Sequence, residues 1–383
     1  MDNLLDYMEE HGGVLFEEEP LNEADNLALC QLTYCDLEDV VPGLGSGRSV
    51  TVARAWRAYE ARRHGPMRRF ENLFSAMARS QRFGCVRLIG WKERFDPKQH
   101  EQFGAYTALL PDGTAYIAFR GTGHHISGWR ENFMMSYKVV AAQLDAQRYL
   151  DCVARVTTGA LHVGGHSKGG NLAAYAAAFC EPATRERICD VWCNDSPGFV
   201  REVVDFDAFA PIANRMHLFV PEFCVVAGIM EQVVRPTVVA SAQQRYRQHD
   251  ALSWRIDGTM LARAEAIAPE CRLTGQVFHH LVYSRSRKER VRIVNRLFDA
   301  ISQSGIETIG DFARGGSTLK RLAMRLYRCG KATCAAAGEV MVGIAAAAVS
   351  LPAGVVALIN YPLVFPALVS LAGTMRRLPF RPF

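Results

Sequence analysis

The chain has 383 residues, of which 49% are hydrophobic and 22% charged, a composition typical of a globular protein with one large core and room for an appendage. Eleven cysteines without the dense spacing of a disulfide framework, and residues 1–23 without the apolar stretch of a signal peptide, indicate a cytoplasmic protein with reduced thiols. The net charge of +5 comes without the signature of a nucleic-acid-binding fold, so we exclude nucleic acid as a partner.

The N-terminal part of the chain is strongly acidic. Residues 1–47 contain twelve Asp and Glu and neither Lys nor Arg, so the other 336 residues carry a surplus of 17 positive charges. Apolar residues recur at helical spacing within residues 1–40, which predicts helices that cover the body of the protein. Two explanations of the charge asymmetry stay open: the acidic arm packs over a basic body, or the basic segments face an anionic membrane.

A basic helix is predicted at about residues 52–63, and strands follow at residues 86–95 and 105–110. Pro111-Asp112-Gly113 predicts a hairpin turn into a third strand at residues 114–119.

This third strand runs into an Arg-Gly-Thr-Gly turn at residues 120–123. Its glycines let the chain turn so that an amide near Thr122 points inward, which predicts one donor of an oxyanion hole. Residues 124–133 mix apolar and polar side chains, which suits either a flap over an apolar substrate or a buried edge.

A Gly-x-Ser-x-Gly pentapeptide, residues 165–169, stands between a short apolar run and an alanine-rich helix pattern. In that context the motif predicts a nucleophile elbow, in which a sharp turn strains the serine backbone and flanking glycines let strand and helix pack closely. Ser167 is the predicted nucleophile, and the amide of Lys168 at the helix N-terminus is the predicted second oxyanion donor. The alternative is a glycine-rich turn with an idle serine.

A serine nucleophile needs a base and a group that orients the base, and in this architecture the acid and then the histidine follow the serine. Asp195 comes directly after a predicted strand at residues 188–193, and is the predicted acid unless it only organises a turn. Glu222, after a strand-like run at residues 216–220, is the alternative acid. His249 lies downstream of both acids and is the predicted base.

The surrounding chain predicts the frame for these residues. Residues 136–158 read as the helix before the elbow strand, and residues 160–255 alternate strand and helix as a parallel sheet requires. A second basic helix is predicted at residues 285–303. Cys189 and Cys193 lack further ligand pairs, so we expect no zinc site, and a serine-dependent mechanism implies neither a metal nor an organic cofactor.

Several short segments within about residues 1–300 recur in the order seen in one known family. They are Leu4-Leu5-Asp6-Tyr7, Asn22-Glu23-Ala24-Asp25-Asn26-Leu27, Gln31-Leu32-Thr33-Tyr34, Ala118-Phe119-Arg120-Gly121-Thr122, Gly128-Trp129-Arg130-Glu131, residues 165–173, Asn194-Asp195-Ser196-Pro197-Gly198-Phe199 and Gln248-His249-Asp250. With them the chain resembles the class 3 lipase branch of α/β hydrolases and, more closely, the bacterial Mbeg1-like family of lipase-like hydrolases.

The resemblance implies an α/β-hydrolase fold, a mostly parallel sheet flanked by helices. It also implies Ser167 as nucleophile, His249 as base, and the amides of Thr122 and Lys168 as the oxyanion hole. Class 3 lipases usually place the acid one strand after Asp195, where this chain has Glu222 and no Asp. Either Asp195 or Glu222 therefore has the role of the acid.

The C-terminal part of the chain changes character beyond Gly316. The 36 residues between Glu339 and Arg376 are uncharged, and a bilayer core needs only about 20 apolar residues in helical form. Prolines break this stretch and basic residues flank it on both sides, which favours a helical hairpin with both ends in the cytoplasm. A buried helical pair and an oligomerising tail are the alternatives.

Together these patterns predict a hydrolase domain at residues 1–310 with an acidic helical arm, followed at residues 311–383 by a basic linker and an apolar tail. The expected activity is serine-dependent cleavage of ester or thioester bonds of apolar acyl substrates, by a cytoplasmic protein that contacts a membrane through residues 340–375. The alternative is a catalytically silent scaffold of the same fold that binds a partner at the membrane; a peptidase on this fold would differ only in its pocket.

Overall fold

An eight-stranded sheet organises the part of the chain that the computed structural model describes, which is residues 3–269, 271, 279–280, 282–308, 311, 321–322, 324–326 and 328. The strands lie side by side in chain order: β1 (Val50–Thr51), β2 (Arg87–Asp96), β3 (Glu101–Leu109), β4 (Ala115–Phe119), β5 (Leu161–His166), β6 (Ile188–Asn194), β7 (Met216–Pro221) and β8 (Thr237–Val239). Strands β1 to β4 pair antiparallel and β4 to β8 pair parallel. The described part of the chain is thus an α/β protein with a mostly parallel sheet.

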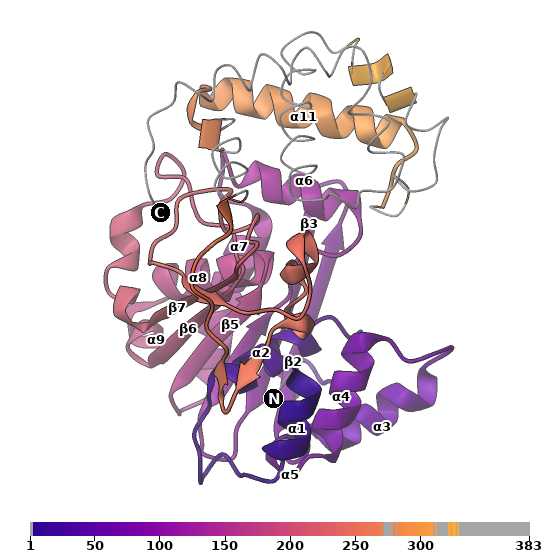
Figure 1. Ribbon diagram of the computed structural model, residues 1–383, viewed down its shortest axis with the longest axis vertical. Helices are drawn as coiled ribbons and strands as arrows, with labels where there is room; N and C mark the ends of the chain where they lie inside the picture. Colours follow the sequence, from indigo (N-terminus) through magenta and orange to yellow (C-terminus); the bar gives the residue numbers. More distant parts are fainter. Residues whose placement is uncertain are drawn as a thin grey trace.

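Helices flank this sheet on both faces. They are α1 (Leu4–Glu10), α2 (Glu23–Leu32), α3 (Val52–Arg62), α4 (Arg69–Arg79), α5 (Gln81–Gly84), α6 (Ile126–Met134), α7 (Ala141–Val156), α8 (Lys168–Phe179), α9 (Pro182–Glu186) and α11 (Arg287–Gln303). Figure 1 shows α6 and α11 together at one end of the molecule, and α1, α3, α4 and α5 gathered at the other. A small hairpin, β9 (Ile256–Asp257) and β10 (Met260–Leu261), contacts α2.

Strand β4 shows why both faces of the sheet are covered. Successive side chains of a strand point to opposite faces. Ala115, Ile117 and Phe119 lie in the core that α7 and α8 close, whereas Tyr116 and Ala118 lie in a second core with the N-terminal helices. All five residues are apolar or aromatic and buried, so each face requires a helical layer. The N-terminal arm supplies one of these layers through α2, which packs on β4 and β5.

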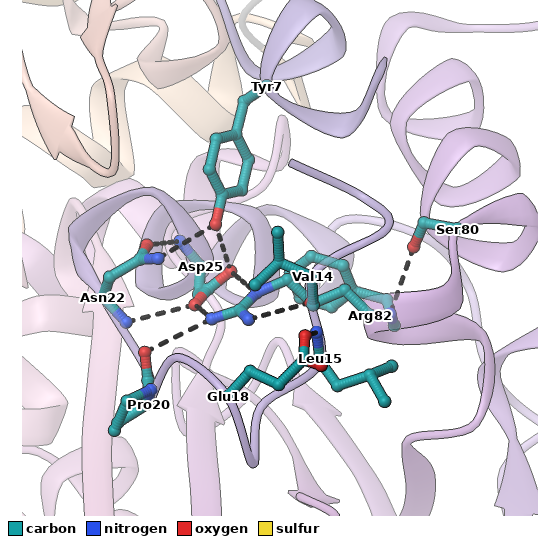
Figure 2. A network of polar contacts seen from close by, with 10 residues as sticks. Tyr7, Val14, Leu15, Glu18, Pro20, Asn22, Asp25, Ser80 and Arg82 are labelled. Carbon is teal, nitrogen blue, oxygen red and sulfur yellow. Dashed lines mark hydrogen bonds and ion pairs between the residues drawn. The ribbon is translucent and has the colours of Figure 1, made fainter. Parts of the chain in front are cut away.

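A buried ion pair fastens the arm to the rest of the chain. Asp25 in α2 and Arg82 in α5 are both almost completely buried, and Arg82 Nε donates to Asp25 Oδ1 over 2.8 Å. Figure 2 shows the network around them: the Tyr7 hydroxyl donates to the same carboxylate at 2.8 Å, and Arg82 also donates to the Val14 and Pro20 carbonyls. Every charge of the pair is therefore hydrogen-bonded, which a buried ion pair requires.

The structure agrees with most of the predicted elements before residue 195 but not with a regular alternation of strand and helix up to residue 255. Between β6 and β7 it has only the 3-10 helices η2 (Phe206–Phe209) and η3 (Ala213–Arg215). Pro197 and Pro211 fall in this connection, and proline removes an amide donor and blocks the preceding helical turn. After β8 the chain forms η4 (Arg245–His249) and η5 (Ala251–Ser253).

The predicted membrane segment, residues 340–375, lies outside the described residues. In the part that is described, no helix is both long enough and apolar enough to cross a membrane. Leu322 and Leu326, from the region at residues 311–383 expected to be a basic linker and apolar tail, are buried in the same core as α7 and α8.

Candidate active site

Ser167 stands in the sharp turn between β5 and α8. Its backbone has φ 58° and ψ −130°, a region that residues with a side chain rarely adopt, so the turn is strained. The flanking glycines explain how strand and helix come so close. A Cβ on Gly165 would lie 2.2 Å from the Gly169 carbonyl carbon, and one on Gly169 would lie 2.1 Å from the Phe119 carbonyl oxygen. The Ser167 side chain therefore stands at the carboxyl ends of β4 and β5.

Asp195 and His249 form a hydrogen-bonded pair beside this turn. Asp195 follows β6 directly, is fully buried, and its Oδ2 lies 2.6 Å from His249 Nδ1. A carboxylate oxygen only accepts, so Nδ1 carries the proton and Nε2 of the neutral ring is left as the free base. The His249 side chain is about one-third exposed, at 34%, so its ring can meet a substrate. No hydrogen bond joins Ser167 Oγ to this ring among the described residues, and such contacts are often loose before substrate binds.

A buried thiol completes the surroundings of the Asp195 carboxylate. Cys224 Sγ donates to Asp195 Oδ1 over 3.0 Å, and burial raises the pKa of this thiol, with the Asp195 charge adding to the effect. The thiol therefore stays protonated and acts as a donor. Each carboxylate oxygen has one partner, which holds the group in a single orientation.

Glu222, the alternative acid, is not drawn into this pair. It follows β7, one strand beyond Asp195, but its carboxylate has no hydrogen bond or ion pair with the described residues. The contact with His249 is made by Asp195 instead.

The segment that carries His249 is fastened by its neighbours on both sides. Gln248 accepts the Phe223 amide at 2.6 Å through its side chain, which ties the segment to the loop after β7. The fully buried Trp254 donates its indole N–H to the Gln248 carbonyl at 2.7 Å, and Asp250 forms an ion pair with Arg69. Three contacts, to Phe223, Trp254 and Arg69, thus fix the segment that carries the His249 imidazole.

The loop after β4 lies against the elbow. A Cβ on Gly121 would lie 2.7 Å from the His166 carbonyl oxygen and 3.3 Å from Ser167 Cβ, so this approach requires glycine. Next to it, the amides of Thr122 and Lys168 have no hydrogen-bond acceptor among the described residues, and Lys168 is the first residue of α8. Unpaired amides beside the serine are what an oxyanion hole requires.

The Lys168 side chain turns away from the serine into the protein. It is fully buried, and its Nζ lies 2.8 Å from Glu131 Oε2 of α6 and 2.5 Å from the Gln102 carbonyl of β3. Burial lowers the pKa of Lys168, while the Glu131 charge opposes that shift. Residues 124–133, for which the sequence left a flap and a buried edge as alternatives, are therefore held to the sheet through Glu131. Trp129 on the same helix is nevertheless 38% exposed.

Sequence reasoning assigned no role in this site to Cys224, Tyr34 or His166, although Tyr34 and His166 stand in two of the recurring segments. His166 Nε2 lies 2.7 Å from the His249 carbonyl oxygen, and its Nδ1 lies 2.9 Å from the Tyr34 hydroxyl. Tyr34 and His166 are 132 positions apart, and no local pattern marks that contact. Within the described residues, no group of three His, Cys, Asp or Glu side chains is arranged to hold a metal ion.

The fold and the site together define an α/β protein that gathers a strained serine, an Asp–His pair and unpaired amides at the carboxyl edge of its parallel strands. The family model described as Mbeg1-like matches residues 77–299, more than half of the chain, and the chain belongs to that family. The crystal structure of M37 lipase is similar over 53% of this chain and 69% of that chain, with 15% sequence identity and a TM-score of 0.32. No curated protein matches the chain.

Proposed function

We propose that the chain is a serine hydrolase of the α/β-hydrolase type, related to class 3 lipases, that cleaves ester or thioester bonds. The observation that carries the proposal is the 2.6 Å contact between Asp195 and His249 next to the strained backbone of Ser167. A buried acid that orients an imidazole beside a serine in a strained strand–helix turn is the arrangement that activates a hydroxyl for acyl transfer.

In this proposal Ser167 Oγ attacks the acyl carbonyl while His249 Nε2 takes the hydroxyl proton. Asp195 keeps the proton of the imidazole on Nδ1 and stabilises the imidazolium that forms. The amides of Thr122 and Lys168 receive the negative charge that develops on the carbonyl oxygen. His249 then passes its proton to the leaving group, and a water molecule repeats the sequence to release the acid and restore Ser167.

The proposed substrates carry an apolar acyl chain. Helix α6 follows the oxyanion loop directly, and its Asn132 side chain donates to Thr122 Oγ1 at 2.8 Å. The same helix exposes Trp129, and an exposed large apolar side chain on the helix after the oxyanion loop suits an apolar acyl chain better than a charged group.

We also propose that residues 340–375 hold the enzyme at a membrane from the cytoplasmic side. The support is the uncharged 36-residue stretch with basic residues on both flanks. A membrane is where esters of long acyl chains are found, so the tail and the proposed activity fit one another.

The decisive test compares wild type with Ser167→Ala. Wild type should react with a fluorophosphonate probe and hydrolyse p-nitrophenyl esters, with a preference along the chain-length series. Ser167→Ala should lose the labelling and nearly all hydrolysis while its thermal unfolding is unchanged; residual turnover from the oxyanion amides is expected in such sites.

If the chain is a catalytically silent scaffold, wild type should show neither labelling nor hydrolysis. In that case Ser167 would not form a hydrogen bond with His249 even when a ligand is bound. Wild type that neither labels nor hydrolyses any ester of the series would establish the scaffold. Equal hydrolysis by wild type and Ser167→Ala would instead move the nucleophile elsewhere.

A further inference from the structure

A directed chain of hydrogen bonds runs behind the proposed catalytic residues. The His249 carbonyl oxygen can only accept, so His166 Nε2, at 2.7 Å, carries the proton and donates it. The neutral ring then has a bare Nδ1, which accepts the Tyr34 hydroxyl proton over 2.9 Å. The Tyr34 oxygen in turn lies against the backbone of Gly121, where an added Cβ would come within 2.2 Å of it. Each hydrogen bond fixes the direction of the next.

This chain connects three separate parts of the site. Gly121 belongs to the loop that ends in the oxyanion amide of Thr122, His166 immediately precedes the nucleophile, and the last acceptor is the backbone of the base itself. The rings of His166 and His249 are also close, with centroids 4.7 Å apart. Tyr34 is where the three parts meet.

The tyrosine comes from the N-terminal arm, outside the residues that match the family model. It comes two residues after the end of α2, its amide donates to the Gln31 carbonyl at 3.1 Å, and its ring stacks on Phe70 of α4 with centroids 4.9 Å apart. Both the ring and the hydroxyl are therefore held before any substrate arrives. A Cβ on Gly121 would lie 2.2 Å from the Tyr34 oxygen, so the loop and the hydroxyl are fitted closely to one another.

We propose that Tyr34 is a positioning residue of the hydrolase site, which holds the oxyanion loop, the elbow and the His249 segment in one register through His166; this inference rests on the proposed function above. Tyr34 touches no reacting atom. It acts through the peptide that leads to Thr122 and through the backbone that carries the His249 ring.

His166 is suited to link Tyr34 to the His249 backbone because its own ring does not compete with His249 as a base. Burial lowers the pKa of His166 to about 3, and the charge of His249 adds to that effect. The ring is neutral throughout the range in which a serine hydrolase works, so its donor and acceptor nitrogens keep their places. Proton transfer is left to His249, whose Nε2 has no partner among the described residues.

Tyr34→Phe removes only the hydroxyl and leaves the ring on Phe70. Turnover of p-nitrophenyl esters by the full-length variant should fall about 10- to 100-fold in kcat with KM within about threefold, since small displacements of reacting groups cost that much. The matched control is Tyr106→Phe. The buried Tyr106 hydroxyl also joins the arm to the sheet, donating to the Leu29 carbonyl at 2.7 Å, but it has no contact with the chain of hydrogen bonds. A merely structural role predicts that both variants act alike.

A second measurement does not depend on catalysis. Proton–nitrogen spectra of the full chain labelled with ¹⁵N-histidine should show His166 as the tautomer protonated on Nε2, unchanged down to about pH 4 as its burial requires. In Tyr34→Phe the signals of the His249 ring should shift, and in Tyr106→Phe they should not.

The outcomes separate the two proposals. Wild type that neither hydrolyses esters nor takes the fluorophosphonate probe overturns the proposed function. If wild type is active but Tyr34→Phe keeps the wild-type kcat, only the Tyr34 proposal is overturned. The same holds if the His249 ring signals of Tyr34→Phe equal those of wild type. If Tyr34→Phe does not fold, the wild-type spectrum tests the proposal by itself. A His166 ring protonated on Nδ1 could not donate to the His249 carbonyl, and this result would overturn the Tyr34 proposal.

Discussion

Asp195 combines an unusual backbone with a completely enclosed side chain. Its φ of 43° lies in the left-handed region, where Asp and Asn are the non-glycine residues that occur most readily, and its amide donates to the Phe219 carbonyl of β7 at 2.7 Å. This conformation turns the carboxylate away from the strand toward His249 and Cys224. The position after β6 therefore suits an acid that must be held in one orientation.

We expect Asp195→Asn to fold, because Asn accepts the same backbone conformation, and to lose kcat on the order of 10⁴-fold. The loss follows because an amide that donates to Nδ1 would favour the wrong imidazole tautomer. Ester hydrolysis at saturating substrate measures it.

Glu222→Gln is the matched control, since Glu222 also follows a parallel strand and its side chain has no described partner. It should leave kcat nearly unchanged. The reverse ranking of the two variants would assign the acid to Glu222, one strand later.

At the scale of elements, the link between α8 and α6 stands out. Lys168 begins α8, and its side chain forms the buried ion pair with Glu131 of α6; Glu131 also accepts the amides of Gln102 at 3.1 Å and Ala142 at 3.2 Å. The ion pair thereby explains the lysine after Ser167 without a chemical role for its amine. The ion pair joins α8, whose first amide is one proposed oxyanion donor, to α6, which follows the loop that carries the other proposed donor, Thr122.

Lys168→Met should lower the free energy of unfolding by about 3–5 kcal/mol, because it leaves the Glu131 carboxylate buried without its cation. Urea denaturation measures the loss. The double variant Lys168→Met with Glu131→Leu should recover part of it, since paired replacement by apolar groups removes the uncompensated charge. A single variant as stable as wild type would mean that Glu131 finds water or another cation.

At the scale of the whole molecule, the acidic arm is a structural layer of the sheet. Gly164 of β5 shows the closeness of its packing, because a Cβ there would lie 2.0 Å from the Tyr116 hydroxyl and 3.1 Å from Asn26 Oδ1. Asn26 also donates to Asn194 Oδ1 at 3.2 Å, one residue before Asp195. Two ion pairs, Asp25 with Arg82 and Glu23 with Arg263, join acidic residues of the arm to basic residues of the body.

Truncations at the two ends should therefore behave differently. Removal of residues 1–47 exposes the face of the sheet that carries Tyr106, Tyr116 and Ala118, so we expect aggregation and no cooperative thermal transition. Removal of the chain after Arg328 keeps the buried Leu322 and Leu326, and should yield a folded protein that hydrolyses short esters.

Fractionation without detergent completes the comparison. Full-length protein should sediment with membranes and the C-terminally truncated form should stay in the high-speed supernatant. A full-length monomer in that supernatant would contradict the membrane proposal, and a cooperative transition after removal of residues 1–47 would contradict the structural part of the arm.

The local elements could be predicted because their signals are local. Apolar runs and glycine turns predicted strands that agree closely with β4, β6 and β7, and helical periodicity predicted α7 and α11 within a few residues. The elbow was recognisable for the same reason, since the pentapeptide, the strand before it and the helix after it are neighbours in the chain. The order of Ser167, Asp195 and His249 was also legible in the sequence; their catalytic roles stay predictions.

Only the tertiary structure decided which side chains meet. The sequence left Asp195 and Glu222 as rivals, and the contact of Asp195 with His249 depends on how β6 and the loop after β8 come together in space. Tyr34, Glu131 and Lys168 stand in segments shared with the family, but the contacts of Cys224, Tyr34 and the Lys168–Glu131 pair had no local signal, because each joins residues at least 29 positions apart. Periodicity reports whether a side chain is buried, but a partner that distant in the chain is set by the packing of whole layers.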